Sequence, residues 1–181
     1  EIVFEKKLDS KVISEIYQVD IYKNNRLQFV FLTEKEFVVL DIKGNYVEKI
    51  TLKKSQSNKY LSVFDYDKNR NYRFVIQNGN TIKMLDSKFN IVKGFKRTKL
   101  KSEIEQKIKH IRISNKDYLV LVGKDGVPLI LDRRGNIRIK LPKNLIIGRN
   151  NFYANSNSFV TINNLNQLIR VELNGKISSK Q

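Results

Sequence analysis

The chain has 181 residues, of which 40% are hydrophobic, and its 35 Lys and Arg residues against 18 Asp and Glu residues give a formal net charge of +17. These values allow one compact core or a short solenoid. The lack of cysteine excludes disulfides and thiolate metal sites and leaves the compartment unspecified, and no apolar run is long enough to span a bilayer.

The first predicted element is an extra outer strand at residues 1–8, where Val3–Leu8 reads VFEKKL. It ends nine positions before Tyr17, a spacing similar to the eight positions between the end of residues 48–52 and Tyr60. The favoured interpretation is that this strand ends a repeat lying upstream, so that the chain is a piece of a larger protein. The alternative is that it closes a ring by pairing with the last repeat and removes an exposed edge. An open arrangement would leave apolar faces at both ends and favour self-association.

Four related segments follow, and each contains an acidic residue after an apolar strand. These anchor residues are separated by 45, 46 and 40 positions and are Asp41, Asp86, Asp132 and Glu172. A period in this range, built from short strands, is typical of repeat proteins and above all of β-propellers. We therefore predict an all-β fold, a β-propeller or a fragment of one, in a single domain over residues 1–181. Its blades lie near residues 17–54, 60–97, 108–143 and 150–180.

Each blade is predicted to contain four antiparallel strands. The second and third are the most apolar, because strands buried on both faces need not alternate. The outer strand alternates, since one of its faces meets water. An alignment without insertions places four apolar residues twelve positions before the anchors, namely Phe29, Phe74, Val120 and Val160.

The turn before the outer strand carries glycine three residues after the anchor, at Gly44, Gly135 and Gly175. Gly followed by Asn, with Asp upstream, suits a hairpin because Gly and Asn accept positive φ. Phe89 occupies this position in the second repeat. We therefore expect the second blade to turn with Asn90 or in a different register.

The connection between the second and third blades does not show the strand pattern of the repeats. Residues 102–111 begin with a capping box formed by Ser102 and Glu105, and Ile104, Ile108 and Ile111 fall at helical spacing. The pattern predicts either a short helix or an irregular connection. A loop that covers a blade edge is favoured over a docking helix.

The repeats FVVLDIKGNYVEKI, IKMLDSKFNIVKGF and LILDRRGNIRIKL resemble those of WD40-like and quinoprotein-like β-propellers. The resemblance covers nearly the whole chain and implies a propeller that serves as a rigid platform for partners. The chain lacks the Gly-His and Trp-Asp signatures of true WD40 repeats and the tryptophans of quinoprotein repeats. Nucleotide or quinone binding is therefore not implied.

Basic residues gather on predicted outer strands and the loops that follow them. They form a possible patch for an anionic partner, made of Lys93, Lys96, Arg97, Lys99, Lys101, Arg133, Arg134, Arg138 and Lys140. A net charge of this size attracts anions and speeds their encounter with the protein. The alternative is a purely structural role, in which these lysines keep a repeat protein soluble and protect its strand edges from pairing with other chains.

No catalytic or cofactor-binding arrangement is visible. His110 is the single histidine, and its place on an apparent inner strand indicates a structural role. Asp65, Asp67 and Asn69 match the opening of a calcium loop, but Arg70 stands where that loop needs glycine, so a turn explains them better. We expect no metal and no cofactor.

The favoured function is a non-enzymatic scaffold that binds a protein or peptide partner through loops at one end of the blades. The alternative is a basic module that binds nucleic acid with the Lys and Arg residues of its outer strands. A further alternative is part of a propeller enzyme whose site is completed by missing blades.

Overall fold

The structure, a computed structural model, describes residues 4–54 and 57–180. These residues form fifteen strands and no helix, so that part of the chain has no helical segment suited to crossing a membrane. The chain divides into two compact units, residues 1–92 (unit 1) and 93–181 (unit 2). Each unit is described by itself, and the expected single domain stays a prediction.

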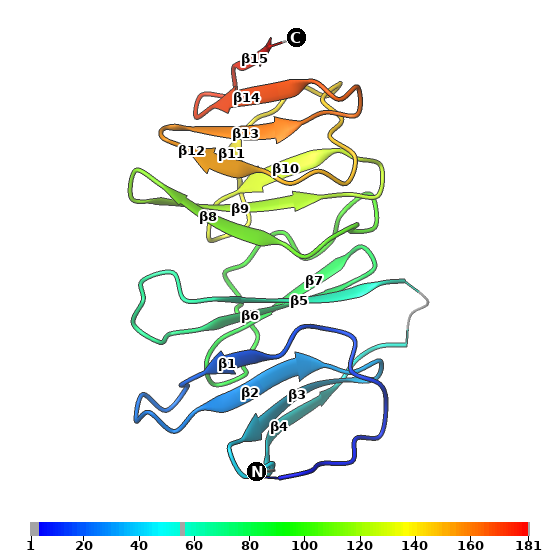
Figure 1. Ribbon diagram of the computed structural model, residues 1–181, viewed down its shortest axis with the longest axis vertical. Coiled ribbons are helices and arrows are strands. Elements are labelled where there is room, and N and C mark those ends of the chain that lie inside the picture. Colours follow the sequence, from blue (N-terminus) through cyan, green and yellow to red (C-terminus); the bar gives the residue numbers. More distant parts are fainter. Residues whose placement is uncertain (1–3, 55–56, 181) are drawn as a thin grey trace. The chain divides into compact units, whose positions relative to one another are not determined.

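Unit 1 contains two antiparallel sheets, whose strands follow the chain order (Figure 1). The first sheet consists of β1 (Tyr17–Val19), β2 (Gln28–Leu32), β3 (Glu36–Asp41) and β4 (Tyr46–Thr51). The second consists of β5 (Lys59–Phe64), β6 (Arg73–Asn78) and β7 (Thr81–Leu85).

Unit 2 also contains two antiparallel sheets. The third sheet of the chain consists of β8 (Lys109–Ile113), β9 (Lys116–Val122), β10 (Pro128–Leu131) and β11 (Ile137–Ile139). The fourth consists of β12 (Tyr153–Asn155), β13 (Ser158–Ile162), β14 (Leu168–Glu172) and β15 (Ile177–Lys180).

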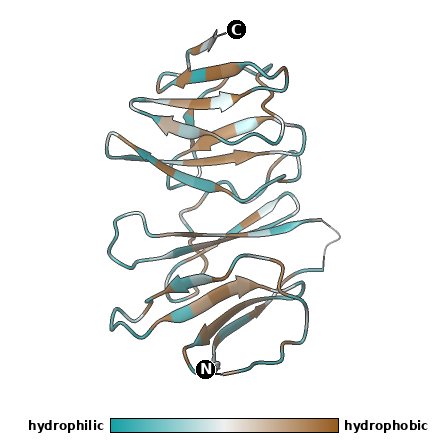
Figure 2. Cartoon of the chain, in the orientation of Figure 1, coloured by the Kyte–Doolittle hydropathy of each residue, from teal (hydrophilic) through white to brown (hydrophobic). Residues whose placement is uncertain are grey.

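The second and third strands of each sheet supply most of the core, and Figure 2 shows hydrophobic residues along them. One cluster joins the two sheets of unit 1 through residues such as Val30, Val39 and Phe74. A separate cluster joins those of unit 2 through Val120, Ile130 and Phe159. This packing explains the apolar character of these strands, because sheets packed face to face exclude water from their inner faces.

The alignment without insertions is wrong by one residue in unit 2. In the first two sheets, the residue before the anchor pairs with the aligned residue, Phe29 or Phe74. In the last two sheets, it pairs instead with the residue one position before the aligned one, Leu119 or Phe159. The hairpins β9–β10 and β13–β14 therefore contain one additional residue. Because side chains alternate between the faces of a strand, this shift changes which residues enter the core.

The expectation for the second turn is also wrong. Phe89 itself adopts φ 63°, close to φ 79° at Gly44, and keeps the same register. Its N–H donates to the carbonyl of Asp86 at 2.9 Å, as Gly44 donates to Asp41 at 3.0 Å. The Phe89 ring lies 5.7 Å from Phe74 and 6.2 Å from Phe37, between centroids. These contacts offset the unfavourable backbone conformation.

The second sheet lacks the predicted outer strand within the described residues. After the turn, the chain forms only an isolated bridge between Leu85 and Ile91, and Val92 donates to the carbonyl of Met84. Gly94 follows shortly, and glycine weakens a strand. An extra outer strand was also predicted at 1–8. Residues 4–8 have no regular secondary structure, and residues 1–3 lie outside the described part.

Each unit begins with an irregular leading segment, residues 4–16 in unit 1 and 93–108 in unit 2. Val12 bridges Thr33 in unit 1, and Ile104 bridges Gly123 in unit 2. The segment at 102–111 is therefore an irregular connection that leads into β8 and not a helix. The two units therefore have the same arrangement, in which an irregular leading segment packs against the first of two antiparallel sheets.

Candidate functional site

All nine residues of the predicted basic patch lie in unit 2, and the structure brings part of the patch together. The N–H of Lys96 donates to the carbonyl of Arg134 at 2.8 Å. Arg97 follows directly, with its backbone nitrogen 2.7 Å from where a Cβ on Gly135 would stand. Gly135 therefore allows the leading segment to approach the turn before β11.

Two patch residues are engaged elsewhere. The Arg133 guanidinium contacts the carboxylate of Asp117 at 2.6 Å, and the Arg138 guanidinium lies 5.3 Å from the centroid of the Tyr118 ring. Lys93, Lys99, Lys101 and Lys140 are exposed. The patch is thus not one continuous surface of equivalent cations, and its role stays a prediction.

The leading segment of unit 2 and the third sheet enclose a cavity of about 620 Å³, which we call the unit 2 cavity. Its aliphatic walls come from both elements and comprise Leu100, Leu121, Val127, Leu129 and Ile137. Its cationic lining residues are Arg97, Lys99, Lys101 and Lys143. A volume of this size lies within the range of ligand pockets.

The cations of the unit 2 cavity have no counterion among the described residues. The Arg97 Nε is buried and has no hydrogen-bond partner there. Asp125 is the one carboxylate of the lining, and its Oδ1 accepts the N–H of Val127 at 3.1 Å within its own hairpin. The cavity therefore combines apolar walls with unneutralised positive charge.

The corresponding place in unit 1 is packed with apolar side chains. Phe31, Val38 and Leu40 pack there against Leu8 and Val12 of the leading segment. The pairing of Phe31 with Val38 matches that of Leu121 with Leu129. A phenylalanine ring in unit 1 thus stands where unit 2 has a smaller leucine.

The charges also differ between the two places. In unit 1, Lys49 Nζ lies 2.9 Å from Asp9 Oδ2 and 3.1 Å from Glu36 Oε1. The hydrogen bond and charge of Lys49 lower the pKa of Asp9, and the two carboxylates raise the pKa of Lys49. By the strand pairing and the bridges, the equivalent unit 2 residues are Lys140, Lys101 and Val127. Unit 2 therefore has no equivalent of either carboxylate: Lys101 stands in place of Asp9, and Val127 stands in place of Glu36.

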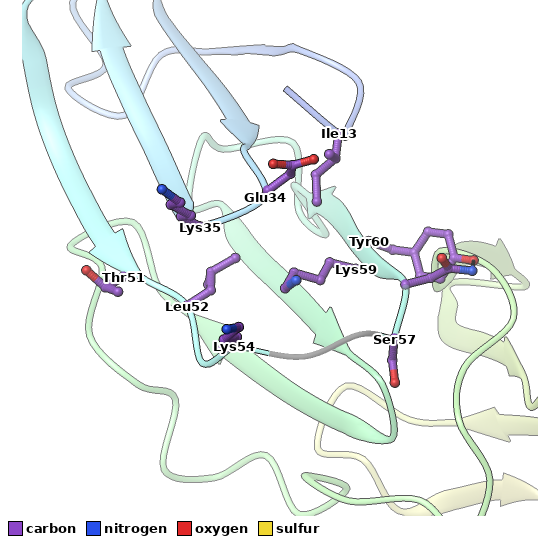
Figure 3. A pocket seen from close by; sticks show the side chains of 10 residues that line it. Ile13, Glu34, Lys35, Thr51, Leu52, Lys54, Ser57, Lys59 and Tyr60 are labelled. Carbon is purple, nitrogen blue, oxygen red and sulfur yellow. Dashed lines mark hydrogen bonds between the residues drawn. The ribbon is translucent and has the colours of Figure 1, made fainter. Parts of the chain in front are cut away.

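A second hollow, of about 900 Å³, lies in unit 1 beside the β2–β3 hairpin and the start of β5. Figure 3 shows Leu52 and Lys59 pointing into it. Its aliphatic lining is limited to Ile13 and Leu52, and Glu34 adds negative charge beside the lysines. It therefore has fewer aliphatic side chains in its lining than the unit 2 cavity.

The remaining candidates have structural contacts. His110 Nε2 lies 2.7 Å from Asp117 Oδ1, beside the Arg133 contact. The carboxylate of Asp65 accepts the N–H groups of Asn69 and Arg70, which places these residues in the turn between β5 and β6. Within residues 4–54 and 57–180, no group of three or more His, Cys, Asp or Glu side chains is arranged to hold a metal ion.

Comparison with solved structures shows the fold. BBS1N, solved in complex with ARL6DN, is similar with a TM-score of 0.63 and 11% identity, over 93% of this chain and 53% of that chain. The WD40 domain of SCAP from fission yeast gives 0.56 and 13%, over 93% and 44%. The complex of the fission yeast SREBP–SCAP binding domains gives 0.55 and 11%, over 96% and 49%.

WD40 domains are β-propellers with four-stranded blades. The predicted fold class is therefore confirmed: this chain has an all-β, propeller-like repeat fold. It spans about half the length of these three solved chains. The sequence matches no protein-family model and is not significantly similar to any curated protein.

Proposed function

We propose that this chain is a non-enzymatic scaffold that binds a protein or peptide partner. The observation that carries the proposal is the group of uncompensated cations around an apolar cavity in unit 2. Two similar propeller-like structures were solved with protein partners, BBS1N with ARL6DN and the SREBP–SCAP binding domains. Antiparallel sheets give a rigid frame from which loops can contact a partner.

The test is capture of proteins from a nuclease-treated extract of the source cells on the immobilised chain, followed by purification of the retained protein. Direct calorimetry at about 50 and 200 mM salt then measures the dissociation constant, because phosphate-driven binding weakens about 10³-fold or more across this range. We expect one partner to remain bound with less than about a tenfold change. The absence of any reproducible partner overturns the proposal.

Nucleic-acid binding is the competing function and is measured in parallel. Labelled single-stranded and duplex oligonucleotides are titrated by fluorescence anisotropy at the same two salt concentrations. Tight binding that collapses at the higher salt, without a protein partner, would replace the scaffold proposal. Self-association through apolar faces at the two ends of the repeat array stays a prediction. Analytical ultracentrifugation of the same sample measures the oligomeric state.

A further inference from the structure

We propose that the unit 2 cavity is a binding site for an acidic peptide segment that carries an aliphatic side chain. The peptide side chain enters between the leading segment and the third sheet, and its flanking carboxylates contact Arg97, Lys99, Lys101 and Lys143. This proposal rests on the proposed function, since it names the chemistry of the partner and the place where it binds.

The aliphatic residues that line the unit 2 cavity indicate which side chain of the peptide can enter it. Leu100 and Leu121 are buried, while Val127, Leu129 and Ile137 retain partial or full exposure around the same cavity. All five are aliphatic, and the lining contains no aromatic side chain. A leucine or isoleucine side chain fits such walls, because burial of its methyl groups there removes apolar surface from water on both partners.

The comparison within the chain determines the charged half. Unit 1 places Asp9 and Glu36 against Lys49 and neutralises it internally. The equivalent positions in unit 2, Lys101 and Val127, supply no carboxylate for Lys140. Unit 1 supplies one carboxylate from its leading segment, Asp9, and one from β3, Glu36. In unit 2 the matching carboxylates must come from another molecule if the cations are to be paired.

The same lining disfavours nucleic acid. A single-strand site normally stacks bases on aromatic rings, and none of the cavity residues is aromatic. Asp125 also lines the cavity and would repel a phosphate backbone. A peptide can place its uncharged aliphatic side chain or its backbone N–H groups beside Asp125, whereas every nucleotide brings a negative charge.

The direct test uses fluorescence anisotropy with the full chain and the labelled heptapeptide EEDLEED. The comparison peptides are EEDSEED, which lacks the aliphatic side chain, and KKNLKKN, which reverses the charge. We expect binding of EEDLEED with a dissociation constant below about 100 μM at 50 mM salt, about tenfold weaker binding of EEDSEED, and none of KKNLKKN. Equal binding of the leucine and serine peptides, or no binding of EEDLEED up to about 1 mM, would overturn the proposal.

Charge-reversed variants test the position of the site. Lys99→Glu with Lys101→Glu changes two exposed cavity lysines and should weaken EEDLEED binding by at least about tenfold. The matched control, Lys116→Glu with Lys176→Glu, changes two exposed lysines outside the lining and removes the same charge. Equal loss in both variants would show unspecific attraction and would refute the site. Circular dichroism of each variant confirms that the sheets remain folded.

The captured partner separates this proposal from the proposed function. A partner that binds the wild-type chain and the Lys99→Glu/Lys101→Glu variant equally would leave the scaffold standing and refute the cavity as its site. If no protein partner is captured, the scaffold proposal fails, and the peptide titrations still decide whether the cavity binds acidic peptides. Binding of oligonucleotides that is abolished by the same two substitutions would reassign the cavity to nucleic acid.

Discussion

Unit 1 and unit 2 share one plan, but they differ in how the leading segment meets the first of the two sheets. In unit 1 the Phe31 ring packs against the leading segment, and Lys49 contacts Asp9 and Glu36. In unit 2 a leucine and a second lysine occupy the corresponding places, and a cavity remains. The difference shows that two units with the same arrangement of leading segment and sheets can differ in internal packing and in the pairing of their lysines.

The largest predicted effect concerns the buried carboxylate of unit 2. Asp117 is 7% exposed and contacts both His110 and Arg133. Asp117→Ala removes the buried carboxylate that both His110 and Arg133 contact and should lower the free energy of unfolding by about 3 kcal/mol. Urea denaturation measures this value. Asp125→Ala, which removes an exposed carboxylate from a hairpin, is the control, and equal losses would contradict the special role of Asp117.

The second prediction concerns the turn that admits the leading segment of unit 2. Gly135 has φ 77°, and a Cβ there would stand 2.7 Å from the backbone nitrogen of Arg97. Gly135→Ala should therefore cost about 2 kcal/mol, from the unfavourable φ and the steric contact. Gly94→Ala is the matched control because no atom lies within 4 Å of its added Cβ. Thermal unfolding that ranks the two variants in the opposite order would refute this account.

The third prediction makes unit 1 resemble unit 2. Phe31 is 3% exposed and packs against the leading segment. Phe31→Leu should cost about 1 kcal/mol, because the smaller side chain leaves a cavity that the structure only partly fills. An unchanged denaturation midpoint would mean that the junction in unit 1 collapses around the smaller residue, and that side-chain size does not explain the cavity of unit 2.

The smallest predicted effect is a dependence on pH. Lys49 lowers the pKa of Asp9, so this contact stabilises the folded state above the ordinary carboxyl pKa of about 3.9, and the stabilisation is lost as pH falls below that value. A side-chain NMR titration should find the pKa of Asp9 below the ordinary carboxyl value in the wild-type chain and closer to that value in Lys49→Met, because the hydrogen bond from Lys49 is the largest cause of the lowering. In Lys101→Asp, the introduced carboxyl should titrate below the ordinary value if unit 2 repeats the geometry of unit 1.

The anchors of the repeats were predictable because their chemistry is local. Asp41 and Asp132 each accept two backbone N–H groups of the following turn with one carboxylate oxygen. The same turns require a residue with positive φ three positions later. Spacing and residue type therefore give the sheets and their order without knowledge of distant contacts.

The register of unit 2 was not predictable in the same way. Tyr118 to Val122 are all apolar and buried, so a shift of one residue leaves an equally hydrophobic face. The tolerance of positive φ by Phe89 also depends on rings from other strands, and no local pattern indicates them.

The candidate site was only partly predictable. Arg97, Lys99 and Lys101 were part of the predicted patch, but Arg133 contacts a carboxylate sixteen residues away, on another strand. Lys143 and the apolar walls were not in the patch, since a cavity depends on which side chains face each other across segments. The signal that could have found it is the comparison of the two halves of the chain, where Asp9 aligns with Lys101 and Phe31 with Leu121.

The chain-order pairing of the strands has a kinetic consequence. Every strand of each sheet is bonded only to strands that neighbour it in the sequence. Each pairing therefore closes a short loop, and the entropy lost before the first stabilising contact is small. Hairpins of this kind form in about 1–10 μs, so the slow steps in folding are those that bring one finished sheet onto another. A substitution that weakens a hairpin should then slow folding more than it speeds unfolding, because the hairpin is already formed when the slow step occurs.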